Sequence, residues 1–134
     1  MTSKVVYQGN LRTKCTHELS GSSFLTDAPL DNNGQGQAFS PTDTVATALG
    51  SCMLTIMGIK AAQMHLELTG SSAEVVKTMA ADPRRISGIH VKLFLPEKTG
   101  EKDRKILQNA ALACPVHKSL HPDMEKDIEF LWTL

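Results

Sequence analysis

One long apolar segment constrains the fold of this chain more than any other feature. It opens with Ser40-Pro41-Thr42-Asp43, which supplies a helix N-cap, a proline at the first helical position and an acid at the third. Apolar residues then recur at helical spacing, so we predict a helix from residue 41 to about residue 64. The expected apolar stripe is Val45, Leu49, Cys52, Met53, Ile56 and Ile59.

This predicted helix is apolar on more than one face, with Leu54 and Met57 off the main stripe. A helix that is apolar nearly all round is buried in a core or between subunits. A chain of 134 residues hardly surrounds such a helix unaided. Gly50 and Gly58 each cost about 1 kcal/mol relative to alanine inside a helix, which indicates that another backbone packs closely there.

The flanking segments alternate between strand-like and helical patterns. Strands are expected at residues 4–7, about 11–18, 22–26, 73–80, 89–95 and 128–132, and a Gly- and Asn-rich loop at 28–40. A second helix is expected at about 100–113, capped by Thr99, with Ile106, Ala110 and Ala113 as its stripe and Leu107 and Ala111 alongside. The order of these elements predicts one α+β domain over residues 1–134, with mostly antiparallel pairing.

Composition excludes several functional classes. Lys plus Arg and Asp plus Glu are equal, at 14 each, so no charge excess favours nucleic acid or an anionic membrane surface. The N-terminal Met-Thr-Ser-Lys leads directly into a strand-like run rather than an apolar signal segment. We therefore expect a cytoplasmic protein.

The chain has three cysteines, Cys15, Cys52 and Cys114. A small, odd number of cysteines argues against a structural disulfide framework. Cys52, in mid-helix, reads most simply as a small buried hydrophobe. The helix dipole acts mainly over the first turn, so a reactive Cys52 would need a cation from elsewhere in the fold. Arg12 and Lys14 are the candidates.

Cys114 precedes Pro115, which suits the first position of a short helix and makes Cys114 its N-cap. Thiols at helix N-termini have lowered pKa values, and a low-pKa thiol is a good leaving group in exchange. The spacing of Cys114, His117 and His121 also resembles metal ligation, with Cys52 as a fourth ligand. Pro122 argues against that interpretation, because it ends the helical face.

Three motifs together resemble the OsmC-like family, which includes osmotically inducible C proteins and organic hydroperoxide resistance proteins. They are residues 25–29 (Leu-Thr-Asp-Ala-Pro), residues 40–43 with 48–52 (Ala-Leu-Gly-Ser-Cys), and residues 114–120 (Cys-Pro-Val-His-Lys-Ser-Leu). The resemblance implies an intertwined homodimer, with two long central helices packed together and sheets outside. It also implies a two-cysteine peroxidase with its sites near the subunit interface.

By this resemblance Cys52 matches the peroxidatic cysteine, Cys114 the resolving cysteine, and Arg12 the strand arginine that stabilises the thiolate. Family members carry a glutamate just after the helix-opening proline to hold that arginine, whereas this chain has Thr42. Asp43 and Asp27 are the possible substitutes.

The implied reaction is reduction of an organic hydroperoxide through a Cys52 sulfenic acid and a Cys52–Cys114 disulfide. A dithiol reductant then restores both thiols, and no metal or organic cofactor is required. Apolar Met53 and Ile56 favour an organic substrate over hydrogen peroxide, although they suit a subunit interface equally well. Thr42 keeps a second interpretation open, in which a non-catalytic dimer binds a small apolar ligand at its interface and the cysteines are idle.

Overall fold

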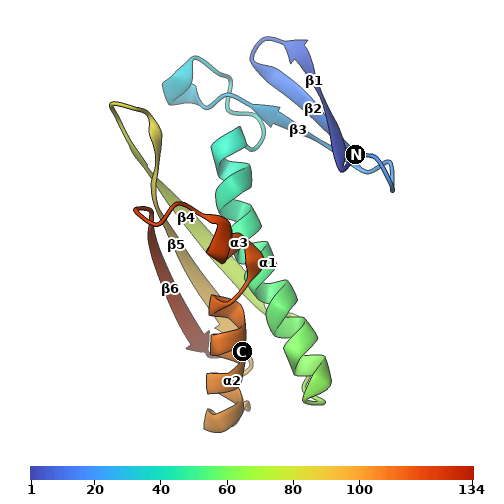
Figure 1. Cartoon of the computed structure of the whole chain (residues 1–134), viewed down its shortest axis with the longest axis vertical. Coiled ribbons are helices and arrows are strands. Elements are labelled where there is room, and N and C mark those ends of the chain that lie inside the picture. The colour runs from blue at the N-terminus through green and yellow to red at the C-terminus, as the bar shows by residue number, and fades with distance from the viewer. The chain divides into compact units, whose positions relative to one another are not determined.

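The computed structural model describes residues 1–134, and the chain divides into two compact units, Met1–Val45 and Ala46–Leu134. Figure 1 shows the elements of each unit. The helix α1 (Pro41–Gln63) begins in the first unit and continues into the second. Its bounds agree with the helix predicted for residues 41–64.

The first unit is an antiparallel sheet of three strands, as expected for this part of the chain. The strands β1 (Ser3–Gly9), β2 (Arg12–His17) and β3 (Ser23–Asp27) lie in that order, and the one-turn helix η1 (Leu30–Asn32) follows in the 28–40 loop. Large apolar side chains of this sheet are exposed within the single chain: Val5, Val6, Tyr7, Phe24 and Leu25.

The β1–β2 hairpin closes through a two-residue loop, because Gly9 is paired with Arg12. Both loop residues have positive φ, 53° at Asn10 and 62° at Leu11. Positive φ at both positions gives the turn a twist that matches the flanking strands. The turn thus sets Arg12 at the first position of β2.

The second unit has two layers. The strands β4 (Ser72–Ala80), β5 (Arg85–Leu95) and β6 (Glu125–Trp132) form one sheet, in which β4 and β5 are antiparallel and β5 and β6 are parallel. The helices α1, α2 (Glu101–Leu112) and α3 (Pro115–Ser119) make up the other layer (Figure 1). The predicted α+β class is confirmed, and three of the four strand pairings are antiparallel.

The core lies between the helices and one face of this sheet. Alternate residues of β5, namely Ile89, Val91, Leu93 and Leu95, are almost completely buried. They belong to one cluster with Leu49, Met53 and Met57 of α1 and with Leu107 and Ala111 of α2. The opposite face of β5 carries His90 and Lys92, which remain partly exposed.

Both helices bury a stripe that is rotated from the predicted one. In α1 Ala46, Leu49, Met53, Met57 and Ala61 are buried, whereas Val45 and Ile59 are 41% and 54% exposed. In α2 the buried residues are Leu107 and Ala111 rather than Ile106, Ala110 and Ala113. Alanine-rich helices offer several apolar faces, so periodicity alone does not select the one that meets the sheet.

Of the local expectations, the cap of α2 was wrong. The N-cap of α2 is Gly100, not Thr99, and no side chain caps it. At Gly58 the predicted close packing has no partner within the single chain, because an added Cβ would meet nothing within 4 Å, and packing there by another copy stays a prediction. A Cβ on Gly50, in contrast, would lie 2.9 Å from Val75 Cγ2, so Gly50 does permit close packing, against side chains of β4.

By length and composition, α1 could also cross a membrane, with a mean hydropathy of 1.5 over a window that is 33% buried. A single helix of this kind is weak evidence for a membrane span, because the core helix of a soluble protein can have the same length and composition. Here α1 contributes one face to the core of the second unit, and its remaining apolar residues, such as Val45 and Ile59, stay exposed within the single chain.

Candidate functional site

Cys52 and Cys114 lie 62 residues apart in the sequence but are neighbours in the second unit. Cys52 is partly buried on α1 and packs against the core, whereas Cys114 is completely buried between α2 and α3. Cys52 lies near enough to raise the pKa of the Cys114 thiol, and both cysteines are free thiols. The fold therefore brings together the two cysteines that the sequence singled out.

Cys114 is the N-cap of α3, as predicted, and its Sγ accepts a hydrogen bond from the His117 backbone N–H at 3.3 Å. The expected lowering of its pKa was wrong. Burial raises the pKa of the Cys114 thiol, and the neighbouring Cys52 raises it further, against the smaller lowering by the His117 N–H. The cost of burying a thiolate outweighs the cap, because α3 is short and the sulfur has no exposed surface.

His117 and His121 do not share the helical face that a metal site would need. Burial lowers the pKa of His117, and Lys126 and Lys118 lower it further, so its imidazole is neutral at pH 7. His121 lies beyond the end of α3, its side chain is 71% exposed, and its Nδ1 accepts a hydrogen bond from the Asp123 backbone N–H.

Arg12 is held in the first unit by Asp27 and Gln37. Its Nε donates to Asp27 Oδ1 at 2.7 Å and its Nη2 to Asp27 Oδ2 at 2.9 Å, a bidentate pair across β2 and β3. The same Nη2 donates to Gln37 Oε1 at 3.0 Å, and the Gln37 backbone N–H donates to Asp27 Oδ2. Arg12 lowers the pKa of Asp27, which is 2% exposed, and so keeps it ionised.

Thr42 and Asp43 take part in the start of α1. The Ser40 backbone N–H donates to Asp43 Oδ2 and the Asp43 N–H to Ser40 Oγ, at 2.9 and 3.0 Å, which is a reciprocal capping box. Thr42 Oγ1 lies 3.2 Å from Ser40 Oγ. Of the two acids considered as substitutes for a glutamate at position 42, Asp27 is the one that forms the bidentate pair with Arg12.

Met53 and Ile56, the predicted apolar substrate contacts, flank Cys52 differently. Met53 is completely buried in the core, and Ile56 is partly buried against it. Arg12 belongs to the first unit and Cys52 to the second, so thiolate stabilisation by Arg12 stays a prediction.

Sequence reasoning missed Gln37. It lies 25 residues from Arg12 in the 28–40 loop, which was recognised as unusually long for a connection. No local pattern marks a glutamine as the partner of a distant arginine. The length of the loop was the only signal.

Comparisons with known proteins show which chains this protein resembles. One similar structure is that of a protein from Psychrobacter arcticus 273-4, provisionally named as an osmotic stress induced and detoxification response protein. It is 52% identical to this chain and superimposes with a TM-score of 0.94, and the match covers 97% of this chain and 95% of the Psychrobacter chain. The organic hydroperoxide resistance protein OhrB of Bacillus subtilis is 20% identical, with a TM-score of 0.71 and coverage of 97% and 98%. The organic hydroperoxide resistance protein OsmC of Legionella pneumophila is 15% identical, with a TM-score of 0.75 and coverage of 96% and 94%.

The similarity to the Bacillus and Legionella structures shows a shared fold. No functionally curated protein matches the chain. The OsmC-like protein family, in contrast, matches residues 34–129, which include both Cys52 and Cys114. The chain therefore belongs to the OsmC-like protein family.

Proposed function

We propose that this protein is a thiol-dependent peroxidase that reduces organic hydroperoxides. The observation that carries the proposal is the placement of two free cysteines from separate helical segments in one core, where Cys52 packs against the buried cluster that includes Cys114 and raises the pKa of its thiol. Two adjacent free thiols can pass between dithiol and disulfide. The names of the Bacillus and Legionella structures support a hydroperoxide as the oxidant.

The reaction balances with the two thiols, a hydroperoxide and an external dithiol. The Cys52 thiolate attacks the peroxide oxygen remote from carbon, the O–O bond breaks, and the alkoxide takes a proton and leaves as an alcohol. Cys52 is then a sulfenic acid. The Cys114 sulfur attacks the Cys52 sulfur, water leaves, and the disulfide forms. A dithiol reduces this disulfide and is itself oxidised.

The different exposures of the two sulfurs suit these roles. Cys52 is the partly exposed member and can meet the peroxide, whereas Cys114 has no exposed surface and can react only with a neighbour. The raised pKa of Cys114 keeps its thiol protonated, which suits a resolving cysteine that reacts only after Cys52 has been oxidised. The external dithiol should likewise attack the disulfide at Cys52.

Arg12 is the proposed cation that stabilises the Cys52 thiolate and the departing oxygen. Asp27 and Gln37 fix its guanidinium through three hydrogen bonds, which limits its rotation. In this proposal Asp27 does the work of the glutamate that position 42 lacks.

We also propose that the protein works as a homodimer. Large apolar side chains are exposed on β1–β3 and on α1, among them Tyr7, Phe24, Val45 and Ile59. Exposed large apolar side chains gathered on one element mark an interaction site. A second copy that covers α1 would also explain the empty space at Gly58.

Intact mass spectrometry tests the peroxidase proposal. One equivalent of an organic hydroperoxide should remove two hydrogens from the reduced wild-type protein, and a dithiol should restore them. Cys52→Ser and Cys114→Ser should abolish this disulfide, and Cys15→Ser is the matched control that should retain it. Undiminished peroxide consumption by Cys52→Ser, with dithiol present, would contradict the proposal.

The same spectra separate the peroxidase from a ligand-binding protein. Both thiols would stay reduced and an apolar compound would co-purify if the dimer only bound a ligand. The Arg12–Asp27 pair favours the peroxidase, because a binding site for an apolar molecule has no need of a fixed guanidinium.

A further inference from the structure

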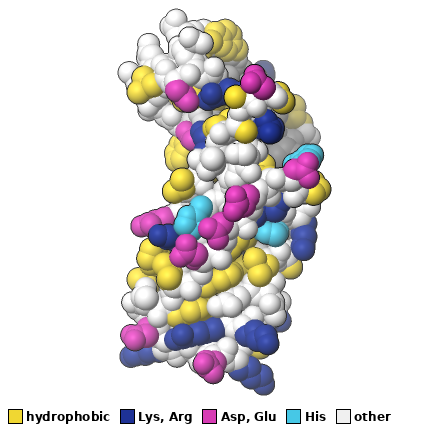
Figure 2. Space-filling model, turned by 90° about the vertical axis from the view of Figure 1, so that its left-hand side faces the viewer, with side chains coloured by type: hydrophobic (Ala, Val, Ile, Leu, Met, Phe, Trp, Pro, Cys, Tyr) yellow, Lys and Arg dark blue, Asp and Glu magenta, His cyan; other side chains and the backbone are white.

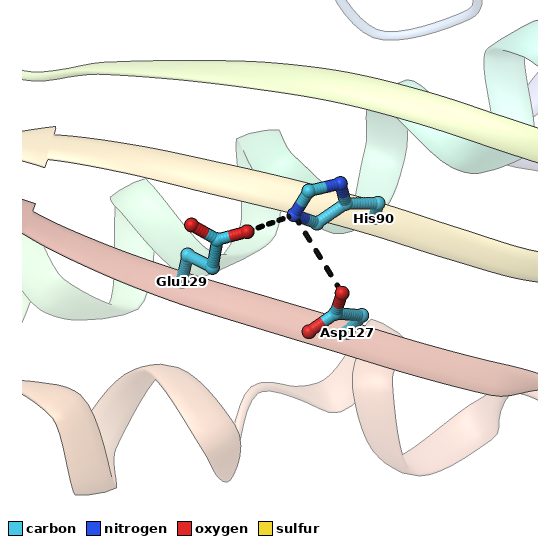
Figure 3. A group of neighbouring side chains, drawn as sticks. All are labelled: His90, Asp127 and Glu129. Atoms are coloured by element: carbon cyan, nitrogen blue, oxygen red, sulfur yellow. Dashed lines mark hydrogen bonds and ion pairs between the residues drawn. The ribbon is translucent and has the colours of Figure 1, made fainter.

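A histidine and two carboxylates converge on the exposed face of the second sheet. His90 comes from β5, and Asp127 and Glu129 come from the adjacent parallel strand β6 (Figure 3). His90 Nε2 lies 2.6 Å from Glu129 Oε1 and 3.7 Å from Asp127 Oδ2. Both carboxylates therefore approach the same ring nitrogen.

The strand register produces this convergence. His90 is paired with Asp127, and Glu129 stands two residues further along β6 and so projects from the same face. His90 lies between the buried residues Ile89 and Val91, which places it on the face opposite the core. Acidic and histidine side chains gather on the side of the second unit that Figure 2 presents.

We propose that these three side chains bind a divalent first-row transition-metal ion such as Zn²⁺. One imidazole nitrogen and two carboxylate oxygens form a ligand set that these ions accept. Ligand atoms placed about 2.1 Å from a tetrahedral ion are about 3.4 Å apart. The two measured separations from Nε2 bracket that distance, and the three ligand atoms lie within 4.8 Å of one another.

Charge and exposure define what kind of site this is. A divalent ion would neutralise the two carboxylates and would replace the hydrogen bond between His90 and Glu129. Lys92 is paired with Glu129 in the strand register, so its positive charge stands on the same face of the sheet. The three side chains are 32%, 60% and 43% exposed, so water would complete the coordination and exchange freely. The site is therefore reversible, and it is separate from the residues of the thiol chemistry.

Titration of the full-length reduced protein with Zn²⁺, followed by calorimetry, tests this site. We expect one ion per chain at a saturable site, with affinity reduced at least about tenfold in His90→Asn, in Asp127→Asn and in Glu129→Gln. The matched control is His121→Asn, which removes an exposed histidine that also lies near an aspartate, 3.9 Å from Asp123. It should bind as the wild type does.

Co²⁺ titration separates this site from the thiols. Nitrogen and oxygen ligation gives only weak visible absorption, whereas thiolate ligation adds an intense near-ultraviolet band. The proposal is overturned by the absence of saturable binding to the wild type, or by binding that His90→Asn and Glu129→Gln leave intact. It is equally overturned if bound Co²⁺ shows the thiolate band and Cys52→Ser abolishes its binding.

Discussion

At the scale of single residues, the chemistry depends on how each ionisable group is partnered. Cys52 lies about three turns into α1, beyond the reach of the helix dipole, and it neighbours a thiol that burial keeps neutral. Its activation must therefore come from a fixed cation. Arg12 is already constrained by a carboxylate and an amide, so it is the best-prepared cation on β2.

Removing Arg12 should slow the reaction of Cys52 at neutral pH. An adjacent cation lowers the pKa of an acidic group by about 1–3 units, so Arg12→Ala should move the midpoint of Cys52 alkylation upward by a shift in that range. The measurement is the pH dependence of alkylation, with the modified cysteine identified by peptide mass. Lys14→Ala is the matched control on the same strand, and a larger effect of Lys14→Ala would reassign the cation.

Removing the Asp27 carboxylate should change how acid affects stability. Arg12 lowers the pKa of folded Asp27 below the ordinary 3.8, so the unfolded chain binds more protons in that window. The resulting stabilisation is complete above about pH 5 and is lost as the pH falls through 3.8 toward the lower folded pKa. Asp27→Asn should therefore flatten the decline in unfolding free energy at acid pH.

Urea unfolding between pH 2 and pH 6 would measure this change in unfolding free energy. This range spans about 2 pH units on either side of the ordinary carboxyl pKa, where the protonation of Asp27 affects stability. Asp123→Asn controls for a general change of charge, because its side chain is 93% exposed. Parallel acid profiles for wild type and Asp27→Asn would show that the ion pair does not persist in solution.

At the scale of elements, the two glycines of α1 differ in their packing, because Gly50 contacts the sheet whereas Gly58 has no neighbour within this chain. Gly50 lies against β4, where an added Cβ would be 2.9 Å from Val75 Cγ2 and 3.4 Å from Ala73 Cβ. Gly58 has no neighbour within 4 Å of that position. The same substitution at the two sites therefore separates packing from helix propensity.

Alanine at Gly50 and at Gly58 should have different effects on stability. Both changes gain about 1 kcal/mol of helix propensity, but only Gly50→Ala forces a methyl group against the rigid side chain of Val75. Overpacking of this kind costs about 1–3 kcal/mol, so Gly50→Ala should be less stable than Gly58→Ala by that amount. Denaturant unfolding of the two variants measures the difference, and equal stabilities would contradict the packing described for Gly50.

At the scale of the whole molecule, the balance of buried and exposed apolar surface points to self-association. The second unit buries a continuous core, whereas the sheet of the first unit leaves Val5, Tyr7 and Phe24 exposed. The chain has 14 basic and 14 acidic side chains, so charge repulsion does not oppose a second copy. Substitutions at the exposed apolar residues of α1 therefore test whether the chain self-associates.

A charge on the outer face of α1 should weaken the proposed dimer. Ile59 is 54% exposed in the single chain, and burying an isoleucine contributes about 1.5–3 kcal/mol. Ile59→Lys should therefore raise the dissociation constant by about tenfold or more, as measured by sedimentation. Val76→Lys is the matched control on the outer face of β4, where Val76 is 60% exposed. A monomeric wild type at micromolar concentration would end the dimer proposal.

The sequence by itself determined most of the helices and strands, and it singled out the two cysteines that the fold brings together. The capping residues Ser40, Pro41 and Asp43 specify where α1 begins, because they satisfy backbone groups of the first turn locally. Alternating apolar residues likewise predicted β5, and Pro115 predicted the break before α3. These signals are local, so a single sequence carries them.

Only the tertiary structure decided which faces are buried and which groups meet. The stripe of α2 is Leu107 and Ala111 because the sheet selects one of several apolar faces. The pKa of Cys114 rises rather than falls because burial, which depends on the packing of other segments, outweighs its helix cap. The contacts of Arg12 with Asp27 and Gln37 join positions 15 and 25 residues apart, and chain folding, not local pattern, sets such distances.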